Sequence, residues 1–567
     1  MTDIRRTLLW VVFSMSLVLI WDAWQKHQGH PSMFSPAPAK TAAPSTPAPT
    51  PVAPVAANGA GTSSVPTASA LGGVAATPPV TTPTPAAASA TEKIVVTTDV
   101  VQATFDTHGG SVIKLELLQQ ADQNNPDRKV TLFDQTAERV YLAQSGLVNT
   151  GGGPALPTHL TNMTVVPGDR TLGSEAKELQ IKFESPDVGG VKLVKTYTLK
   201  RGDYAIGVRY DVVNDSAAPV SPQLYVQLVR DGNAPPGESS FYSTFTGPAM
   251  YTEAAKFQKV PFKDIDKGAA SHEKTADNGY VAMVQHYFAS AWLLPANTQR
   301  EFFTRKVDNN LYSIGMLVPL GAIAPGATKA LDAQLFAGPQ QENQLSTLAP
   351  GLELVKDYGW FTILAKPLFW LLVKLHAILG NWGWSIVGLV VCLKIAFFWL
   401  NAQAYKSMAK MKAVNPKVME MRERLKDKPQ QMQQEMMRIY REEKVNPLGG
   451  CLPIVIQIPF FIALYWVLLS SVEMRNAPWI GWVHDLSAKD PYFILPLLMT
   501  ASSLLQTWLN PRPPDPVQAK MMWIMQIVLS FMFFYFPAGL VLYWLTNNIL
   551  SIAQQWAINK RLGVLGK

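Results

Sequence analysis

One apolar stretch, interrupted by a single charge, constrains this chain more than any other feature. From Asn381 to Tyr405 the sequence reads NWGWSIVGLVVCLKIAFFWLNAQAY, long enough as a helix to cross the roughly 30 Å hydrocarbon core of a bilayer. Lys394 lies near its middle, and at about 1.5 Å per residue it is roughly 16 Å from Tyr405, where polar sequence begins. The side chain is too short to reach water along that path. Burying its ammonium in lipid would cost at least about 2.5–3.5 kcal/mol, so some local feature of the protein must lower this cost.

The remaining apolar sequence offers no carboxylate to pair with Lys394. Between residues 446 and 559 every acidic side chain lies between apolar segments rather than inside one. These side chains are Glu473, Asp485, Asp490 and Asp515. The sequence therefore predicts a water-filled cavity around Lys394 and a partner that brings its own negative charge, since intramembrane charges are usually functional. The alternative is a lysine that is hydrated where the bilayer is thinned and has no role in binding.

Composition agrees with a membrane protein that carries a soluble part. The 567 residues are 48% hydrophobic and only 16% charged, whereas a globular average is about 25% charged. Both cysteines, Cys392 and Cys451, lie in apolar segments. The soluble part therefore has no disulfide framework, and cysteine usage does not identify its compartment.

The N-terminal segment has the pattern of an uncleaved membrane anchor. Arg5 and Arg6 precede an apolar run from Leu8 to Trp21, and no small-residue cleavage pattern follows directly. We expect residues 1–27 to form a transmembrane anchor with a cytoplasmic N-terminus; a cleaved signal peptide is the alternative. Residues 28–91 are rich in Pro, Ala, Thr and Ser and contain very few large apolar side chains, which predicts a disordered tether.

Residues 92–350 show short alternating runs between turn residues, which predict an all-β sandwich with its own core. The clearest runs cover residues 93–105, 192–199, 205–213, 223–229 and 311–317. The sequence of this part has no Cys/His cluster with metal spacing and no phosphate-binding glycine loop. His286 lies among apolar and aromatic residues, so we interpret it as a core histidine. We expect no enzyme activity, no catalytic residue, no metal and no cofactor.

Residues 351–380 are long enough to span a membrane but are interpreted as an interfacial amphipathic helix. Lys366, Trp370 and Lys374 recur every four residues and share one helical face. Residues 402–446 contain 11 Lys/Arg and 6 Asp/Glu, a net charge of +5, and such basic loops stay in the cytoplasm. This loop is cytoplasmic only if 351–380 does not cross.

The sequence then predicts six transmembrane helices, of which the last five follow residue 380. Beyond the N-terminal anchor they cover residues 381–402, 447–472, 491–509, 521–536 and 539–558. A periplasmic loop at 473–490 and a turn at Pro537 lie outside, and the basic tail ends inside. This is a polytopic α-helical membrane protein with a large β domain.

The basic loop at 403–446 reads as a helical hairpin rich in methionine. Its apolar positions follow a near 3.5-residue period, and they form either a plain seam between two helices or an adaptable surface for apolar clients. The positive charge could also contact ribosomal RNA or lipid headgroups. The candidate contact residues are Met408, Met411, Lys412, Met421, Arg422, Met432 and Met436.

Several motifs resemble one family, the YidC-type membrane protein insertases of the YidC/Oxa/Alb group. The motifs that carry the resemblance are NWGWS at 381–385, SMAKM at 407–411, EKVNPLGGC at 443–451, HDLS at 484–487 and PAGLVLYW at 537–544. In the soluble part, QHYFA at 285–289 and DYGW at 357–360 resemble the Gram-negative branch. The resemblance covers nearly the whole chain apart from the tether.

The resemblance implies a fold and a site. It implies a five-helix insertase core around a hydrophilic groove, which opens to the cytoplasm and to lipid, preceded by a periplasmic β-super-sandwich. The groove cation, usually arginine in the family, is Lys394 here, and Val390 stands where a threonine is frequent. An apolar slide would involve 448–472 and 521–536. The other groove or slide candidates are Gln457, Pro459, Gln526, Tyr543, Trp544 and Asn547.

The resemblance also implies a function, partners and a location. The protein would insert and help to fold new inner-membrane proteins, alone or with the Sec translocon. Expected partners are nascent membrane proteins, Sec translocon components, the ribosome and signal-recognition machinery, and membrane lipids, but not DNA. The location would be the cell inner membrane, multi-pass, with the N-terminus cytoplasmic and the large domain periplasmic.

Two other functions are compatible with parts of the sequence. A secondary transporter could use Lys394 as an anion or proton-coupling site, but such proteins usually show internal repeats, and we find none. A carbohydrate enzyme anchored by its helices would need a carboxylate pair, and none is evident.

Overall fold

The structure is a computed structural model that describes residues 65, 92–123, 125, 127–149, 153–235, 244–426, 428–443, 452–510 and 516–561. The predicted N-terminal anchor, most of the tether, residues 444–451 and 511–515, and the C-terminal tail lie outside the described residues. The chain divides into two compact units, Leu17–Lys356 and Met1–Ser16 with Asp357–Lys567. We describe each unit separately.

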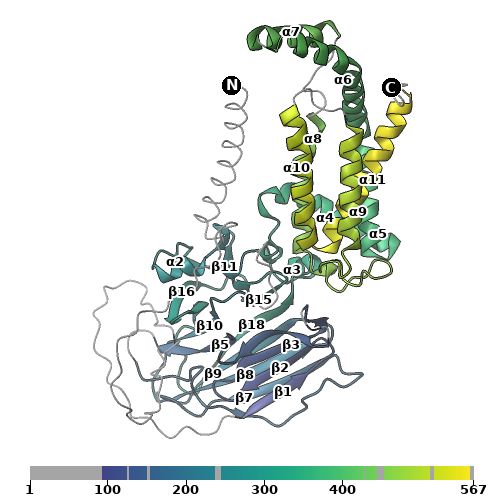
Figure 1. Cartoon of the computed structure of the whole chain (residues 1–567). Helices are drawn as coiled ribbons and strands as arrows, with labels where there is room; N and C mark the ends of the chain where they lie inside the picture. Colours follow the sequence, from purple (N-terminus) through teal and green to yellow (C-terminus); the bar gives the residue numbers. More distant parts are fainter. Residues whose placement is uncertain are drawn as a thin grey trace, which may run out of the picture. The chain divides into compact units, whose positions relative to one another are not determined.

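The first unit contains two nine-stranded antiparallel sheets (Figure 1). The first sheet has the order β1-β2-β3-β4-β5-β10-β17-β16-β13. Its strands are β1 (Lys93–Thr97), β2 (Val101–Asp106), β3 (Ser111–Ala121), β4 (Lys129–Gln135), β5 (Val140–Asn149), β10 (Pro222–Asp231), β17 (Leu311–Pro319), β16 (Arg300–Asp308) and β13 (Thr275–Ala276). Four of the strand runs expected from the sequence are single strands and the run at 93–105 is divided into β1 and β2, which confirms the β-rich prediction for this unit.

The second sheet has the order β12-β11-β14-β15-β18-β9-β8-β7-β6. Its strands are β12 (Lys256–Lys259), β11 (Gly247–Thr252), β14 (Tyr280–Val284), β15 (Phe288–Leu293), β18 (Thr328–Pro339), β9 (Ala205–Asn214), β8 (Val191–Lys200), β7 (Glu178–Glu184) and β6 (Thr164–Val165). Two short helices, α2 (Phe262–Asp266) and α3 (Glu342–Leu348), complete the unit.

In the outer strands the alternation of apolar and polar residues determines which face is buried, whereas β10, β11, β14 and β15 are buried throughout. In β2 and β7 every second side chain is buried, as the two-residue period of a strand requires. Phe105 from β2 packs against Phe183 from β7 and Tyr197 from β8, with ring centroids 5.6 and 4.8 Å away. The core therefore joins side chains from both sheets, as in a sandwich. His286 is half-buried and shares a 2.7 Å hydrogen bond with Thr244, in keeping with a structural role.

A buried histidine predicts how this unit responds to acid. The Tyr225 hydroxyl accepts the backbone N–H of His159 at 3.0 Å and shares a 2.6 Å hydrogen bond with its ring Nδ1. Burial, and then the positive charge of Lys195, lowers the pKa of His159 to about 3. The unfolded chain binds this proton from about pH 6.5 downward and the folded chain does not. Stability is therefore complete above pH 6.5 and declines as the pH falls towards 3.

We expect His159→Asn to remove much of this acid sensitivity. The asparagine Oδ1 can accept the Tyr225 hydroxyl, and the amide does not titrate. At pH 7 the two proteins should be of similar stability, and at pH 4 the wild type should have lost up to ~3 kcal/mol that the variant keeps. Hydrogen exchange of the β10 amides in the purified protein, measured across this pH range, tests the prediction. Parallel acid curves for the two proteins would contradict it.

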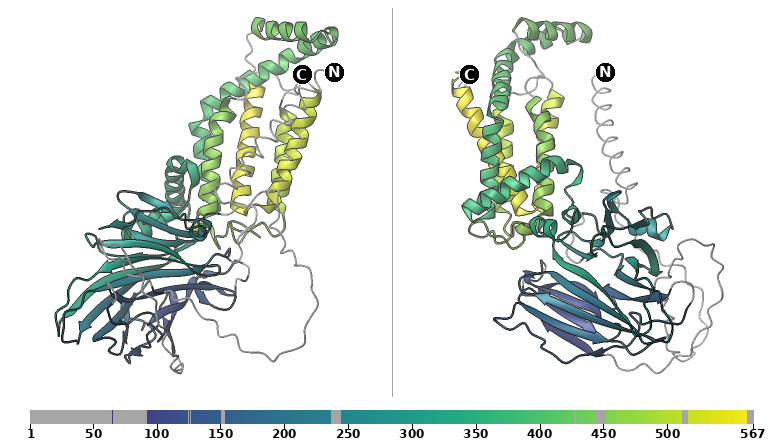
Figure 2. Two further views of the ribbon diagram at one scale, coloured as in Figure 1. Left: turned by 90° about the vertical axis from the view of Figure 1, so that its left-hand side faces the viewer. Right: turned by 180° about the vertical axis from the view of Figure 1, so that it is seen from behind.

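The second unit is helical. Its helices are α4 (Thr362–Leu379), α5 (Trp382–Ala396), α6 (Phe398–Arg424), α7 (Pro429–Glu442), α8 (Leu452–Ser470), α9 (Ile494–Leu509), α10 (Pro516–Met532) and α11 (Ala538–Arg561). Helices α9, α10 and α11 run alongside one another, and the hairpin of α6 and α7 extends beyond one end of this bundle (Figure 2). A shared apolar cluster holds the bundle together, with Leu372, Ile386, Leu464, Met499 and Val541 among its buried members.

The predicted span at 381–402 is not one straight helix. It breaks at Phe397, and α5 and α6 meet at a bend of 68°. No proline or glycine lies at the break, so the sequence contains none of the usual signals of a kink. The Gln554 side-chain amide donates to the Phe398 carbonyl oxygen at 3.3 Å, which satisfies a backbone acceptor at the bend.

Among the described helices, α4 alone is long and apolar enough to span a membrane, and the bent α5–α6 pair adds one further candidate. The apolar parts of α8, α9 and α10 are shorter. The predicted number of crossings therefore stays a prediction. The exposed face of α4 carries Trp370 and Lys374, whose ammonium lies 5.9 Å from the indole centroid. Such a pair is typical of a helix at a membrane interface.

The loop between α8 and α9 closes one end of the helical unit. Its backbone bonds to the start of α11, where the Ala538 and Gly539 N–H groups donate to the Ala488 and Leu486 carbonyl oxygens at 2.7 and 2.8 Å. Asp490 is almost fully buried beneath this contact. The end of the bundle that carries this loop is therefore packed with protein.

Candidate functional site

The site is built around Lys394, in the last turn of α5. Its ammonium donates to the Ser551 hydroxyl on α11 at 2.7 Å, and that hydroxyl in turn donates to the Asn547 carbonyl oxygen at 2.7 Å. The Tyr405 hydroxyl on α6 lies against the same Ser551. No carboxylate among the described residues forms an ion pair with Lys394. The cation is therefore held by a neutral hydroxyl, and the lack of a paired carboxylate agrees with the sequence.

Helix α11 supplies most of the polar side chains because one of its faces is polar over about two turns, from Asn547 to Gln555. Asn548 donates from Nδ2 to the Ser502 and Ser503 hydroxyls on α9, at 3.2 and 2.7 Å. Gln555 reaches the end of α9 at Leu509 and Asn510. These bonds fix α11 against α9, and Ser551, on the adjacent face of α11, meets Lys394 of α5.

Further polar side chains of the helical unit have no protein partner within the described residues. Gln457 on α8, Gln526 on α10 and the Asn547 amide form no hydrogen bond there, and the buried Asn401 Nδ2 on α6 has none either. Buried or half-buried amides without partners are costly unless water reaches them. They lie on α6, α8, α10 and α11, so four helices of the unit each contribute one such group.

The aromatic pair Tyr543 and Trp544 lies within packed apolar surroundings. Phe461 from α8 stacks on Trp544 with ring centroids 5.6 Å apart, and Phe533 meets Trp544 at 4.9 Å. Tyr543 is 2% exposed. The pair therefore packs α8 and α11 together two turns before Ser551. Pro459 lies inside α8, two residues after Gln457.

Broad apolar faces flank these polar groups. On α10, Met525, Val528 and Phe531 are 67%, 65% and 65% exposed, and on α8 Ile458 and Ile462 are also exposed. Large apolar side chains exposed along a whole helix face are expected only where lipid or another apolar chain covers them. The structure thus places both predicted slide helices at the surface of the unit.

The methionines of the hairpin mostly pack within it. Met421 is buried with Val414, Val418 and Tyr440, and three further methionines are half-buried against this cluster: Met411, Met432 and Met436. Met408 and Arg422 are half-buried and Lys412 is exposed. The structure therefore shows the seam between the helices, while Met419 and Met437, which the sequence analysis did not select, are half-exposed.

Ser551 is the residue that sequence reasoning missed. It lies 157 positions after Lys394, and the one signal for it is its spacing of four residues from Asn547, which places both on one face of α11. No group of three or more His, Cys, Asp or Glu side chains that could hold a metal occurs among the described residues.

Two family models match consecutive parts of the chain. The model described as YidC periplasmic domain matches residues 93–371, and the model described as 60Kd inner membrane protein matches residues 374–563. The boundary between the two matches follows the change from β sheets to helices.

Curated relatives match the chain over nearly its full length. The membrane protein insertase YidC of Cupriavidus necator is 56% identical over 562 residues, which is 99% of this chain and 98% of the relative. The membrane protein insertase YidC of Ralstonia nicotianae is 57% identical over 570 residues, with the same coverage of both chains. A solved structure of an active YidC insertase, with its first transmembrane domain resolved, is 19% identical over 82% of this chain and 92% of that chain, with a TM-score of 0.37. The assignment rests on the relatives and the family models.

Proposed function

The chain belongs to the YidC family of membrane protein insertases, and we propose that it moves the polar flank of a client through a hydrated groove around Lys394. Membership in this family makes it an inner-membrane protein with a periplasmic domain and an insertase rather than an enzyme or a transporter. The observation that carries the groove proposal is the contact of Lys394 with Ser551, in a core where other polar groups have no protein partner.

In this proposal the groove lowers the barrier for the polar part of the client. An acidic tail leaves bulk water more easily when a cation and hydrated amides are present along its path. The attraction between opposite charges is several-fold stronger in such surroundings than in bulk water. Because no carboxylate of the described residues neutralises Lys394, its charge is available to the client.

The client's apolar segment provides the driving force. Each CH₂ group that leaves water contributes roughly 0.8 kcal/mol. The exposed faces of α8 and α10 would guide that segment, because Val528 and Ile462 already present an apolar surface to it. No covalent bond changes in this process.

We infer the topology from the charge pattern. The N-terminal anchor and the five later apolar segments give six crossings, with the N-terminus and the basic hairpin in the cytoplasm. Helix α4 then lies at the periplasmic interface, which its exposed Trp370–Lys374 pair supports. The packed loop around Asp490 closes the groove on the periplasmic side.

The hairpin is the proposed contact surface for the translation machinery. Lys412 and other exposed basic side chains suit ribosomal RNA and signal-recognition machinery, while Met419 and Met437 offer half-exposed apolar contacts to a client. The Sec translocon and anionic lipids are further proposed partners, in keeping with the family.

Removing the Ser551 hydroxyl tests whether insertion depends on the position of the Lys394 ammonium. We expect Ser551→Ala to slow insertion of an acidic-tailed client by about two- to fivefold, because one hydrogen bond worth about 1 kcal/mol is lost while the charge remains. The measurement is the rate at which the client becomes protected from protease in liposomes. The matched control is Ser385→Ala at the other end of α5, where the hydroxyl bonds only to the Asn381 carbonyl oxygen. Equal rates for both variants and wild type would remove Ser551 from the site.

A further inference from the structure

One residue of the predicted tether is described by the structure, and it lies on the β unit. The Val65 carbonyl oxygen accepts a hydrogen bond of 2.9 Å from Nη1 of Arg305, on β16. The Val65 side chain packs against a small apolar cluster whose buried members are Val148, Tyr225 and Leu317. The domain therefore contacts both the backbone and the side chain of this one residue.

The cluster lies on the face of the first sheet that is turned away from the second sheet. Tyr141 on β5 identifies the inner face, because its hydroxyl bonds to Ser290 on β15 of the second sheet. Val148 lies an odd number of residues further along β5, so its side chain points to the opposite face. Register places Tyr225 on β10 and Leu317 on β17 on the same face as Val148. Val65 thus covers part of the outer face of the first sheet.

Phe303 and Arg305 on β16 complete this site. Phe303 pairs with Gly315 on β17, and its ring leans over that glycine, where an added Cβ would clash with it. The Arg305 guanidinium carbon lies 5.5 Å from the Phe303 ring centroid, a distance typical of a cation–π contact. Both side chains are therefore oriented by contacts within the sheet, which presents a hydrogen-bond donor next to an apolar surface.

The tether sequence explains why Val65 is the residue that is bound. Residues 28–91 contain five valines, and Val65 alone among them is followed directly by a proline. The residue before a proline is restricted to extended conformations, and β-branched valine favours them as well. Val65 is therefore preorganised to offer its side chain and its carbonyl oxygen together, which reduces the entropy lost on binding.

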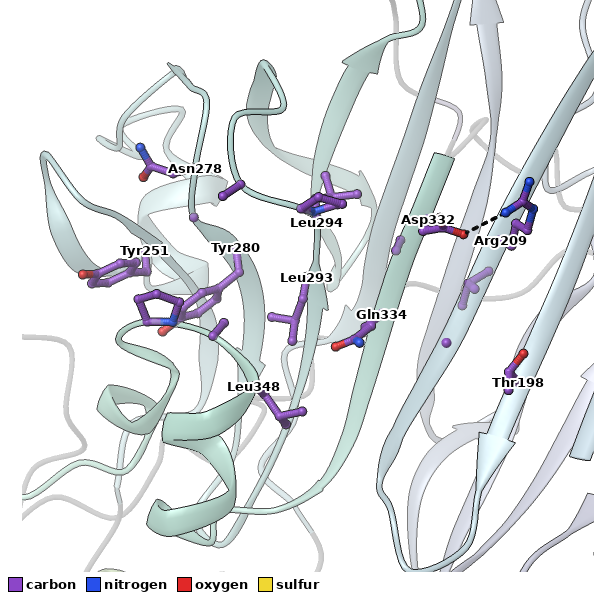
Figure 3. Close-up of a pocket in the computed structure, with 18 of the residues that line it drawn as sticks. Thr198, Arg209, Tyr251, Asn278, Tyr280, Leu293, Leu294, Asp332, Gln334 and Leu348 are labelled. Atoms are coloured by element: carbon purple, nitrogen blue, oxygen red, sulfur yellow. Dashed lines mark ion pairs between the residues drawn. The ribbon is translucent and has the colours of Figure 1, made fainter. Parts of the chain in front are cut away.

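This site is separate from the large cavity of the β unit. That cavity, of about 630 Å³, is lined by strands of the second sheet, with Thr198, Gln334 and Tyr280 among its residues (Figure 3). None of the described residues that line it belongs to the cluster beneath Val65. The contacts of Val65 therefore need an explanation of their own.

We propose that the outer face of the first sheet is a docking site for the tether of the same chain, with Val65 and Pro66 as its occupant. Because the tether is covalently attached, its effective concentration at the site is on the order of millimolar, so that one side chain and one hydrogen bond form a populated contact. The connection between the predicted membrane anchor and the domain then comprises residues 28–64 instead of 28–91. The docked tether limits how far the domain can move from the membrane.

The test uses the full-length protein in liposomes with a photo-reactive aliphatic residue at position 65. Cross-linked peptides are mapped by mass spectrometry, and we expect them to join position 65 to β16 and β17. The matched control carries the same photo-reactive residue at position 74, a tether valine that is followed by Ala75 rather than by proline. Its cross-links to these strands should be at least about fivefold fewer, because it lacks the preorganised backbone.

Two variants test the contacts that hold position 65. Arg305→Met removes the donor and keeps an apolar side chain, and it should reduce the cross-links about tenfold, because hydrogen bonds from charged groups are stronger than neutral ones. Pro66→Gly leaves every residue of the β unit unchanged and frees the backbone of the tether, so it should reduce the cross-links about threefold. The second variant decides the matter if Arg305→Met disturbs the fold of the domain.

A mixture of isotope-labelled and unlabelled protein shows which chain fills the site. Position 65 and the strand that it joins should carry the same label. Cross-links between a labelled and an unlabelled chain would show that a second copy is the occupant, and would overturn the proposal. Equal yields from positions 65 and 74 would overturn it as well, and so would a yield from position 65 that Pro66→Gly leaves unchanged.

Discussion

Lys394→Glu is expected to abolish insertion of clients with acidic tails, while Lys394→Arg supports it. Reversing the charge replaces attraction by repulsion. At an effective dielectric constant of about 20, two charges 4 Å apart interact by about 4 kcal/mol. We therefore expect at least a tenfold fall in the insertion rate for Lys394→Glu. The insertion rate of Lys394→Ala should lie between those of Lys394→Arg and Lys394→Glu, because alanine removes the attraction without adding repulsion.

The control for this prediction is a second client whose acidic tail residues are replaced by their amides. Wild type and the three Lys394 variants should insert that client at nearly the same rate, since its neutral tail is not attracted to the charge at position 394. Growth of cells depleted of their own insertase gives an independent readout for the same variants. If all four proteins inserted the acidic client equally well, the apolar faces of α8 and α10 would carry the function and Lys394 would have no part in it.

Asp490→Ala is expected to destabilise the helical unit by about 3 kcal/mol, because it leaves several buried donors without an acceptor. The carboxylate accepts the Trp482 indole N–H at 3.1 Å and the Tyr492 and Leu495 backbone N–H groups at 3.0 and 2.7 Å. It therefore joins the loop before α9 to the first turn of that helix. Its loss should loosen the packed end of the helical unit.

The measurement is thermal unfolding in detergent, followed with a fluorophore that reacts with Cys392 when α5 becomes accessible. The matched control in the same loop is Asp485→Ala. Asp485 is half-buried and accepts only from Ser487, through its N–H and hydroxyl at 2.8 Å each, so its loss should cost about 1 kcal/mol. Equal decreases in the unfolding temperature of the two variants would show that the Asp490 contacts do not stabilise this end of the helical unit.

The features that were predicted from the sequence are those that local patterns determine. Strands with one buried face follow from alternation over short runs, as β2 and β7 show, whereas β10 is buried on both faces and appears as a nearly continuous apolar run. The isolation of Lys394 was also predictable, since no apolar segment contains an acid. The expected groove and the slide helices came from the family motifs, because no periodicity in the chain predicts them.

Other features depend on tertiary packing and were not predictable. The break at Phe397 has no proline or glycine to signal it, and the partner of Lys394 comes from a helix 157 residues away. Methionine spacing in the hairpin fits a seam and a client surface equally well. The structure shows that Met421 packs in the seam with Tyr440. A client surface on the hairpin would therefore use other residues.

The proposed groove contains water and opens to the cytoplasm, and cysteine labelling along α10 tests both properties. In a protein with Cys392 and Cys451 replaced by serine, single cysteines are placed at Gln526 and Val528, which lie two residues apart and about 200° around the helix. A membrane-impermeant maleimide added to the cytoplasmic face should label position 526 and leave the lipid-facing position 528 unlabelled, because thiols react as thiolates in water. Position 526 as unreactive as 528 would show that no water reaches the groove, and would contradict the account.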